Sequence, residues 1–133
     1  MKKHEYKLTI KEPHLDFMGH VNNATYLTIL EEARWELLLD YNYTLNDILK
    51  SGIGPVILEC NIKFIKEIKL REKITIETQI SALENKIGYI EQVILNENKE
   101  ICTKAKFTFG FFDMKQRKLV EPEQKFKDIV NSN

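Results

Sequence analysis

Residues 16–23 read Asp-Phe-Met-Gly-His-Val-Asn-Asn, so an acid, an imidazole and two amides stand close together in the chain. An amphipathic helix is expected to begin directly after them. Two explanations are open. The groups can form an ordinary capped turn, in which an asparagine side chain accepts a free N–H of the first helical turn. They can also form an active site, in which Asp16 and His20 act at the mouth of the helix.

Asp16 is the strongest candidate for a reactive group in this stretch. It lies just before a helix N-terminus, where the positive end of the helix dipole favours the ionised carboxylate. The alternative is a loop aspartate that only helps to cap the helix. His20 has two interpretations as well: a neutral ring that anchors the loop, or a group that orients water or polarises a carbonyl, since imidazole changes charge near physiological pH. Gly19 is expected to allow a tight turn.

The helix that must position these groups is predicted from Ala24 to about Asp40, with Asn22 or Asn23 as its N-cap. A second, short helix is expected over residues 45–50, ending at Gly52. Five apolar side chains of the long helix recur at helical spacing and form one stripe: Tyr26, Ile29, Leu30, Ala33 and Leu37. Three side chains are expected on the opposite side: Thr28, Glu32 and Trp35.

Charge pairing on the same helix is predicted from spacing. Glu31 and Arg34 lie three residues apart, so their side chains can form a structural ion pair. Tyr26 belongs to the apolar stripe, and a place in the core and a contact with substrate are both open for it.

Strand patterns occupy most of the remaining chain. Residues 4–11 alternate polar and apolar, and further strands are predicted at 56–64, 74–80, 89–95 and 103–112. The last four, joined by short turns, predict an antiparallel meander on which the long helix packs, which is an α+β fold. Residues 107–112 are apolar on both sides, so a homodimer is expected to bury the second face of the sheet. The segment 122–130 is either a helical turn or an edge strand.

Composition restricts the class of protein. The 133 residues fit one domain over 1–133, with 43% apolar and 30% charged residues and a formal net charge of zero, which argues against nucleic acid as a partner. No apolar run reaches the roughly 20 residues that cross a bilayer, and the N-terminus lacks the apolar region of a signal peptide. We expect Cys60 and Cys102 to be buried thiols in a reducing cytoplasm. They lack metal-ligand spacing, and His4 and His14 belong to no cluster, so no metal site is predicted.

The stretch Leu-Asp-Phe-Met-Gly-His-Val-Asn-Asn-Ala-Thr-Tyr-Leu-Thr-Ile-Leu-Glu-Glu-Ala-Arg-Trp-Glu-Leu-Leu, residues 15–38, resembles the signature of hotdog-fold thioesterases. It is most similar to the long-chain acyl-CoA thioesterase III branch of the 4-hydroxybenzoyl-CoA thioesterase group. The order of strand, helix and four strands agrees with that family over essentially the whole chain. The resemblance implies a hotdog fold, in which an antiparallel five-stranded sheet wraps around one long helix. It also implies a homodimer, often assembled further into a homotetramer, with active sites at the subunit interface.

The same resemblance assigns roles to residues. Asp16 matches the family's catalytic carboxylate, which either attacks the thioester carbonyl or activates water as general base. Backbone N–H groups at Asn23 or its neighbours match the donors to the carbonyl oxygen. In related plant acyl-carrier-protein thioesterases the motif is Asp-x-Asn-x-His; Asp16 and His20 keep its spacing, but Met18 replaces the asparagine. Catalytic residues are thus predicted at Asp16 and His20, and substrate-binding residues at Asn23 and Tyr26.

The predicted function is hydrolysis of a medium- to long-chain acyl-CoA to a free acid and coenzyme A, without a cofactor beyond the coenzyme A of the substrate. Two alternatives are kept: an acyl-carrier-protein thioesterase, which would favour a basic surface, and a non-catalytic acyl-binding hotdog domain, which would favour loss of the loop acid. Four side chains are expected to set the depth of an acyl pocket: Leu30, Leu37, Ile57 and Phe64.

Overall fold

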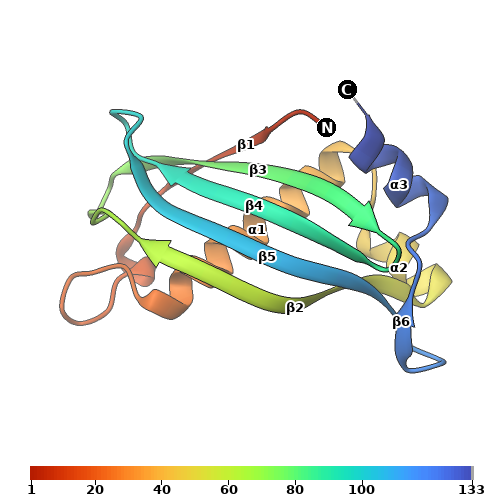
Figure 1. Cartoon of the computed structure of the whole chain (residues 1–133). Helices are drawn as coiled ribbons and strands as arrows, with labels where there is room; N and C mark the ends of the chain where they lie inside the picture. The colour runs from red at the N-terminus through yellow and green to blue at the C-terminus, as the bar shows by residue number, and fades with distance from the viewer. Residues whose placement is uncertain (133) are drawn as a thin grey trace.

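The computed structural model describes residues 1–132, apart from the side chain of Ala82, and shows one long helix packed across a sheet (Figure 1). The helical elements are η1 (Glu12–His14), α1 (Asn23–Asp40), α2 (Leu45–Ser51) and α3 (Gln124–Asn131). The strands are β1 (His4–Thr9), β2 (Ile53–Phe64), β3 (Lys73–Glu84), β4 (Ile87–Leu95), β5 (Ile101–Asp113) and β6 (Lys118–Val120). This arrangement confirms the predicted α+β fold.

The sheet is antiparallel throughout, with the order β1-β3-β4-β5-β2 and the short β6 paired to β5. The predicted four-stranded meander is wrong in one connection. Hairpins join β3 to β4 and β4 to β5, but β2 lies beside β5 and not beside β3. The connection over residues 65–72 is long enough to carry the chain from the edge strand β2 past β5 and β4 to β3, whereas the turn at 85–86 only reverses it.

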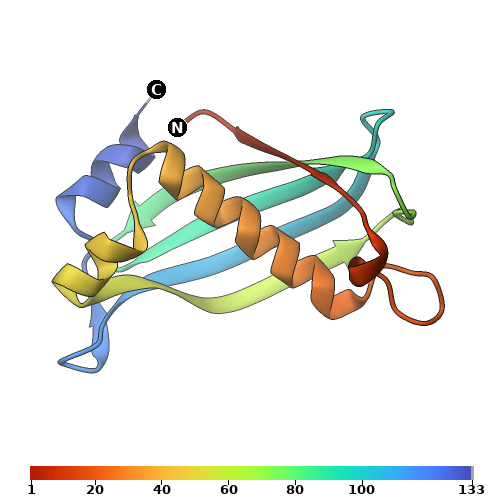
Figure 2. The same cartoon turned by 180° about the vertical axis from the view of Figure 1, so that it is seen from behind.

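Helix α1 crosses one face of the sheet, and its start lies at the same end of the molecule as the end of β2 (Figure 2). Asn22 is its N-cap, as predicted, and the helix ends at Asp40. The five predicted stripe residues are all buried, which confirms the stripe. Trp35 is expected on the outside, but it is partly buried and packs against the core. The buried face of the helix is therefore wider than the five-residue stripe.

Gln92, on β4, links α1 to the sheet through buried hydrogen bonds. Its side-chain amide donates to the carbonyl oxygen of Leu30 at 3.0 Å and to Oγ1 of Thr78 at 2.9 Å, and its Oε1 accepts from Arg34 Nη1 at 3.0 Å. Gln92 is 1% exposed. A buried polar group that loses its partners costs about 1–3 kcal/mol, so this network favours one position of α1 on the sheet.

The structure also tests the predictions for the short helix, for the segment 122–130 and for the two cysteines. The short helix α2 ends at Gly52, which has a φ of 73°, as the glycine signal predicted. The segment 122–130 contributes to helix α3, whose Phe126, Ile129 and Val130 are buried. Cys102 is buried as expected, but Cys60 is exposed, because β2 is an edge strand with one open side.

The outer face of the sheet, which is turned away from α1, also differs from expectation. At its centre β5 presents Lys104 and Lys106, both exposed. Gly110 is buried beside Leu119, and the Arg117 guanidinium lies 4.9 Å from the centre of the Phe112 ring. Apolar side chains are exposed on and after β2, among them Ile57, Leu58, Phe64 and Ile65, whose exposed fractions are 39%, 45%, 54% and 55%.

We predict that Gln92→Leu lowers the free energy of unfolding by about 2 kcal/mol, because it removes partners from Arg34, Thr78 and the Leu30 carbonyl together. A urea unfolding curve measures this change. The control is Gln116→Leu in an exposed turn, for which a change within about 0.5 kcal/mol is expected. Equal effects of the two substitutions would contradict the importance of the buried network.

Candidate active site

The loop before α1 is a tight, hydrogen-bonded turn. An isolated antiparallel bridge joins Leu15 to Val21, and the Asp16 N–H donates to the His20 carbonyl oxygen at 2.8 Å. The Gly19 N–H donates back to the Asp16 carbonyl oxygen at 3.1 Å, and Gly19 has a φ of 80°. This left-handed conformation favours glycine, as predicted. At the tip of the turn, Phe17 is 99% exposed and Met18 is 64% exposed.

The Asp16 carboxylate uses one oxygen to hold this turn. Its Oδ1 accepts the N–H of Met18 at 2.9 Å and the N–H of His20 at 3.1 Å. Within residues 1–132, no hydrogen bond engages its Oδ2. Asp16 is partly buried. One carboxylate oxygen therefore serves the structure of the loop, and the other is free to act on a neighbouring molecule.

Among the described residues, one backbone donor in the first turn of α1 has no acceptor. Oδ1 of Asn22 accepts the Ala24 N–H at 2.8 Å, and the Asn22 carbonyl oxygen accepts the N–H groups of Thr25 and Tyr26 at 2.9 and 3.3 Å. For the Asn23 N–H, the described part of the chain offers no hydrogen-bond acceptor. A free N–H at the positive end of an 18-residue helix can stabilise negative charge on a nearby oxygen.

A shallow groove of about 370 Å³ lies at this helix start. Tyr26, on α1, meets Phe64, on β2, edge to face with 4.8 Å between ring centres. Tyr26 is 8% exposed, and this burial raises the pKa of its hydroxyl. It therefore belongs to the core and to the groove wall at once. The lining residues are His20, Val21, Asn23, Tyr26, Phe64, Glu67 and Ile68.

The structure brings three of the four predicted site residues to this groove: His20, Asn23 and Tyr26. Asp16 is not a lining residue; its carboxylate accepts the N–H of His20, which does line the groove, at 3.1 Å. The His20 ring approaches Glu67 instead, with 3.6 Å between Nε2 and Oε1. Sequence reasoning missed Glu67, which follows β2 in the 65–72 connection and carries no local signal of its place. Both side chains are more than half exposed, so this contact contributes little to stability.

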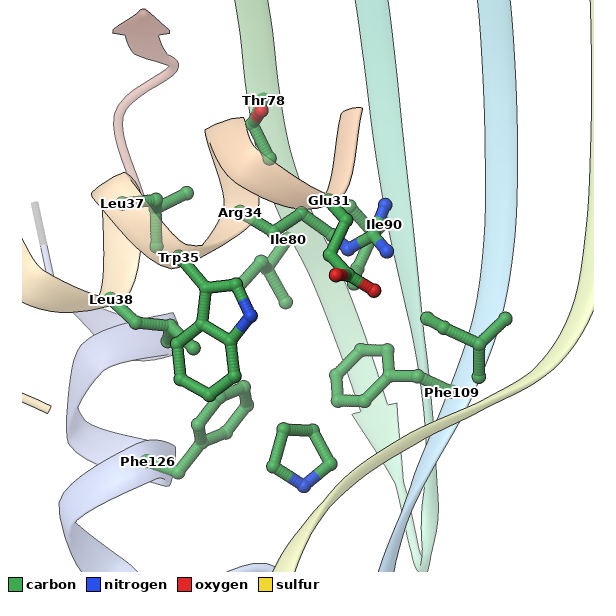
Figure 3. A pocket seen from close by; sticks show the side chains of 12 residues that line it. Glu31, Arg34, Trp35, Leu37, Leu38, Thr78, Ile80, Ile90, Phe109 and Phe126 are labelled. Carbon is green, nitrogen blue, oxygen red and sulfur yellow. The ribbon is translucent and has the colours of Figure 1, made fainter. Parts of the chain in front are cut away.

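A second, interior cavity of about 120 Å³ lies between α1 and the sheet (Figure 3). Its wall is mainly apolar and includes Trp35, Leu38, Phe109 and Phe126. Leu37 and Ile57, two of the four side chains expected to set the depth of an acyl pocket, line it too. Leu30, which is fully buried, does not line it, and Phe64 lines the groove instead.

The predicted ion pair between Glu31 and Arg34 is wrong. Within residues 1–132, the two charged groups do not approach within 4.0 Å of each other. The Arg34 guanidinium turns inward to Gln92 and lies 4.5 Å from the centre of the Phe107 ring. Burial lowers the pKa of Arg34 from its usual value. Arg34 donates to Gln92 and not to Glu31, because the bond to Gln92 also completes the buried hydrogen-bond network on the sheet.

The two remaining histidines lie apart from this site. His4 Nε2 contacts Asp40 Oδ2 at 2.6 Å, and His14 Nδ1 accepts the Lys11 N–H at 2.9 Å. In the described residues 1–132, no three His, Cys, Asp or Glu side chains are grouped so that they could hold a metal ion. Of the described helices, none combines the length and apolar character that a membrane crossing requires.

The chain is similar to a known protein family and to characterised proteins. The family described as the thioesterase-like superfamily matches residues 12–130. The long-chain acyl-CoA thioesterase FadM of Escherichia coli is 32% identical over 92% of this chain and 92% of its own length. The acyl-acyl carrier protein thioesterase ATL2 of Arabidopsis thaliana is 31% identical over 86% of this chain and 61% of its own length.

A solved structure agrees over nearly the whole fold. YbaW of Escherichia coli, described as a probable thioesterase, superimposes with a TM-score of 0.82 at 30% identity and covers 95% of each chain. The family match over residues 12–130 includes the loop, the start of α1 and the edge strand β2.

Proposed function

Since the chain belongs to the thioesterase-like superfamily and is a thioester hydrolase, we propose that it hydrolyses acyl-CoA to a free carboxylic acid and coenzyme A. One observation carries the proposal. The Asp16 carboxylate lies in the loop that leads into α1, and among the described residues neither its Oδ2 nor the Asn23 N–H at the helix start has a hydrogen-bond partner. Thioester hydrolysis needs these two groups: one that delivers oxygen to the carbonyl carbon and one that stabilises the carbonyl oxygen.

The proposed reaction begins with the thioester carbonyl in the groove, its oxygen directed at the Asn23 N–H. In one route, Asp16 takes a proton from water while the water oxygen attacks the carbonyl carbon. In the other, Asp16 attacks the carbon itself, and water hydrolyses the resulting anhydride. In both routes the carbon–sulfur bond breaks and coenzyme A leaves as a thiolate that is then protonated. His20 is proposed to orient the water, and Tyr26 to contact the substrate from the groove wall.

The acyl chain is proposed to be of medium or long length. The FadM relative, a long-chain acyl-CoA thioesterase, supports this, and so does the apolar wall of the interior cavity. The ATL2 relative keeps an acyl-carrier-protein substrate as the alternative. Parallel assays with one acyl group on coenzyme A and on the carrier protein separate the two.

No cofactor is proposed, because the reacting groups belong to the chain, the substrate and water. The proposed location is the cytoplasm.

The active unit is proposed to be a homodimer, which can assemble further into a homotetramer. Strand β2 is a long edge strand, and such an edge usually needs a partner or a cover. It carries the exposed Ile57, Leu58 and Phe64, and Phe17 at the loop tip is exposed too. A second copy that pairs along β2 would cover apolar surface next to the groove and would complete its open side.

We predict that Asp16→Asn lowers kcat by at least about 10²-fold, because the amide keeps an oxygen for the loop hydrogen bonds but cannot act as nucleophile or base. His20→Ala is expected to lower kcat about tenfold if the ring only orients water. Thiol release from the best acyl-CoA measures both. A thermal melt is the control, since loss of the turn would cost on the order of 1 kcal/mol. Near wild-type turnover by folded Asp16→Asn protein would make the residue a structural one.

Activity is predicted to rise from acetyl-CoA toward longer acyl-CoA substrates, because each buried methylene group contributes roughly 0.8 kcal/mol. Part of this gain appears in KM alone. An acyl series from two to sixteen carbons tests this. A flat profile, or a preference for an aromatic acyl group, would count against the long-chain assignment while leaving thioester hydrolysis intact.

Light scattering at micromolar concentration is predicted to give at least twice the 15.7 kDa of the chain. Ile57→Lys with Leu58→Lys is expected to shift the protein toward monomer, because it places charge on the proposed contact. The matched control is Leu49→Lys, an exposed apolar residue of α2. A stable wild-type monomer would overturn the dimer proposal.

A further inference from the structure

We propose that three lysines on the outer face of the sheet, Lys63, Lys104 and Lys106, bind phosphate groups in the nucleotide part of coenzyme A. This inference rests on the proposed function, because it concerns how the same substrate is held. Lys63 belongs to β2, and Lys104 and Lys106 belong to β5. On β5 the two lysines alternate with the buried Phe107, which contacts Arg34 of α1, so they project from the side of the sheet that is turned away from α1. Together they are called the lysine patch below.

The register of the strands places like charges against each other. Lys63 on β2 lies directly opposite Lys104 on β5. Lys106 follows two residues after Lys104 and therefore projects from the same face. Like charges directly opposite on neighbouring strands are destabilising. Because the pairing of Lys63 with Lys104 weakens the folded chain, a bound anion that offsets both charges would explain why the two lysines are present.

The ammonium groups of the lysine patch lack acidic partners in the described residues. All three side chains are exposed, and none has a carboxylate within 4.0 Å. Other basic residues of the chain do find such partners, for example Lys66 with Glu100 and Arg71 with Glu12.

A hollow of about 370 Å³ collects these groups in one place. The three lysines line it together with the amide of Asn61 and one acid, Glu91, which lies opposite Lys106 on β4. Three positive charges and one negative charge leave a net of two positive charges around the hollow. Lys106 Nζ lies 5.0 Å from the centre of the Tyr89 ring, a cation–π contact that holds one ammonium group over this face.

The position of the patch relative to the groove fits one extended ligand. Lys63 directly precedes Phe64, and successive side chains of a strand point to opposite faces. Phe64 lines the groove at the start of α1, whereas Lys63 lines the hollow on the other face. A ligand with its thioester in the groove reaches the patch by passing around the end of β2. Acyl-CoA has this form, since its phosphates lie at the end remote from the thioester.

The test compares two ligands that differ in the nucleotide. The first variant combines Lys104→Gln with Lys106→Gln. Calorimetry measures its affinity for free coenzyme A and for pantetheine. Enzyme assays measure its KM for decanoyl-CoA and for decanoyl-pantetheine. Each exposed charge pair is expected to contribute about threefold, so the double variant should bind coenzyme A about tenfold more weakly and raise the KM for decanoyl-CoA equally. Values for pantetheine and its thioester, and kcat, should not change. High salt should reduce the difference between wild type and variant.

The matched control is Lys7→Gln, an exposed lysine on the same face at the opposite edge strand β1, which should bind coenzyme A as the wild type does. Lys63→Gln, which removes the like-charge pair, is the second variant; it should weaken binding about threefold and leave the melting temperature equal or slightly higher.

Wild-type affinity for coenzyme A in both patch variants would overturn the inference, as would an equal loss for pantetheine. A changed oligomeric state with unchanged coenzyme A affinity would also overturn it, because the patch would then contact a second copy. Coenzyme A binding that depends on the lysines, in a protein that hydrolyses no acyl-CoA, would support the patch and reject the proposed function.

Discussion

The burial of the apolar face of α1 against the sheet is the contact on which the rest of the structure depends. It fixes the helix axis, and so it fixes the place of the helix N-terminus next to the end of β2. The Tyr26–Phe64 ring contact lies at this junction, and the buried Gln92 network holds the helix further along. Because the loop of residues 15–21 leads directly into the helix, the position of Asp16 and of the Asn23 N–H follows from the same packing.

The candidate site combines structural and chemical demands in one short turn. One oxygen of Asp16 holds the turn, and the other makes no hydrogen bond in the part of the chain that the structure describes. Asn22 caps the helix and accepts the N–H groups of Ala24, Thr25 and Tyr26, and within residues 1–132 the Asn23 N–H has no acceptor. The capped turn and the active site are therefore not exclusive explanations, since the cap produces the unpaired donor that a thioester oxygen needs.

Local sequence patterns predicted the local structure well. The stripe from Tyr26 to Leu37, the N-cap Asn22 and the stop at Gly52 all follow from interactions within a few residues. Placement across the sheet could not be predicted in this way. The position of β2 beside β5 depends on long-range pairing, and an irregularity between Ile57 and Glu59 shifts its alternation, so that Ile57 and Cys60 pair with Phe109 and Phe107 on one face. Arg34 and Glu67 likewise take partners that no local spacing indicates.

The most direct test of the central claim is a crystal structure with an acyl-CoA analogue in which a methylene group replaces the thioester sulfur. The account predicts the carbonyl oxygen about 3 Å from the Asn23 N–H, with an Asp16 carboxylate oxygen, or a water bound to it, within about 3.5 Å of the carbonyl carbon. A carbonyl group bound away from the start of α1, for example in the interior cavity between α1 and the sheet, would contradict the account.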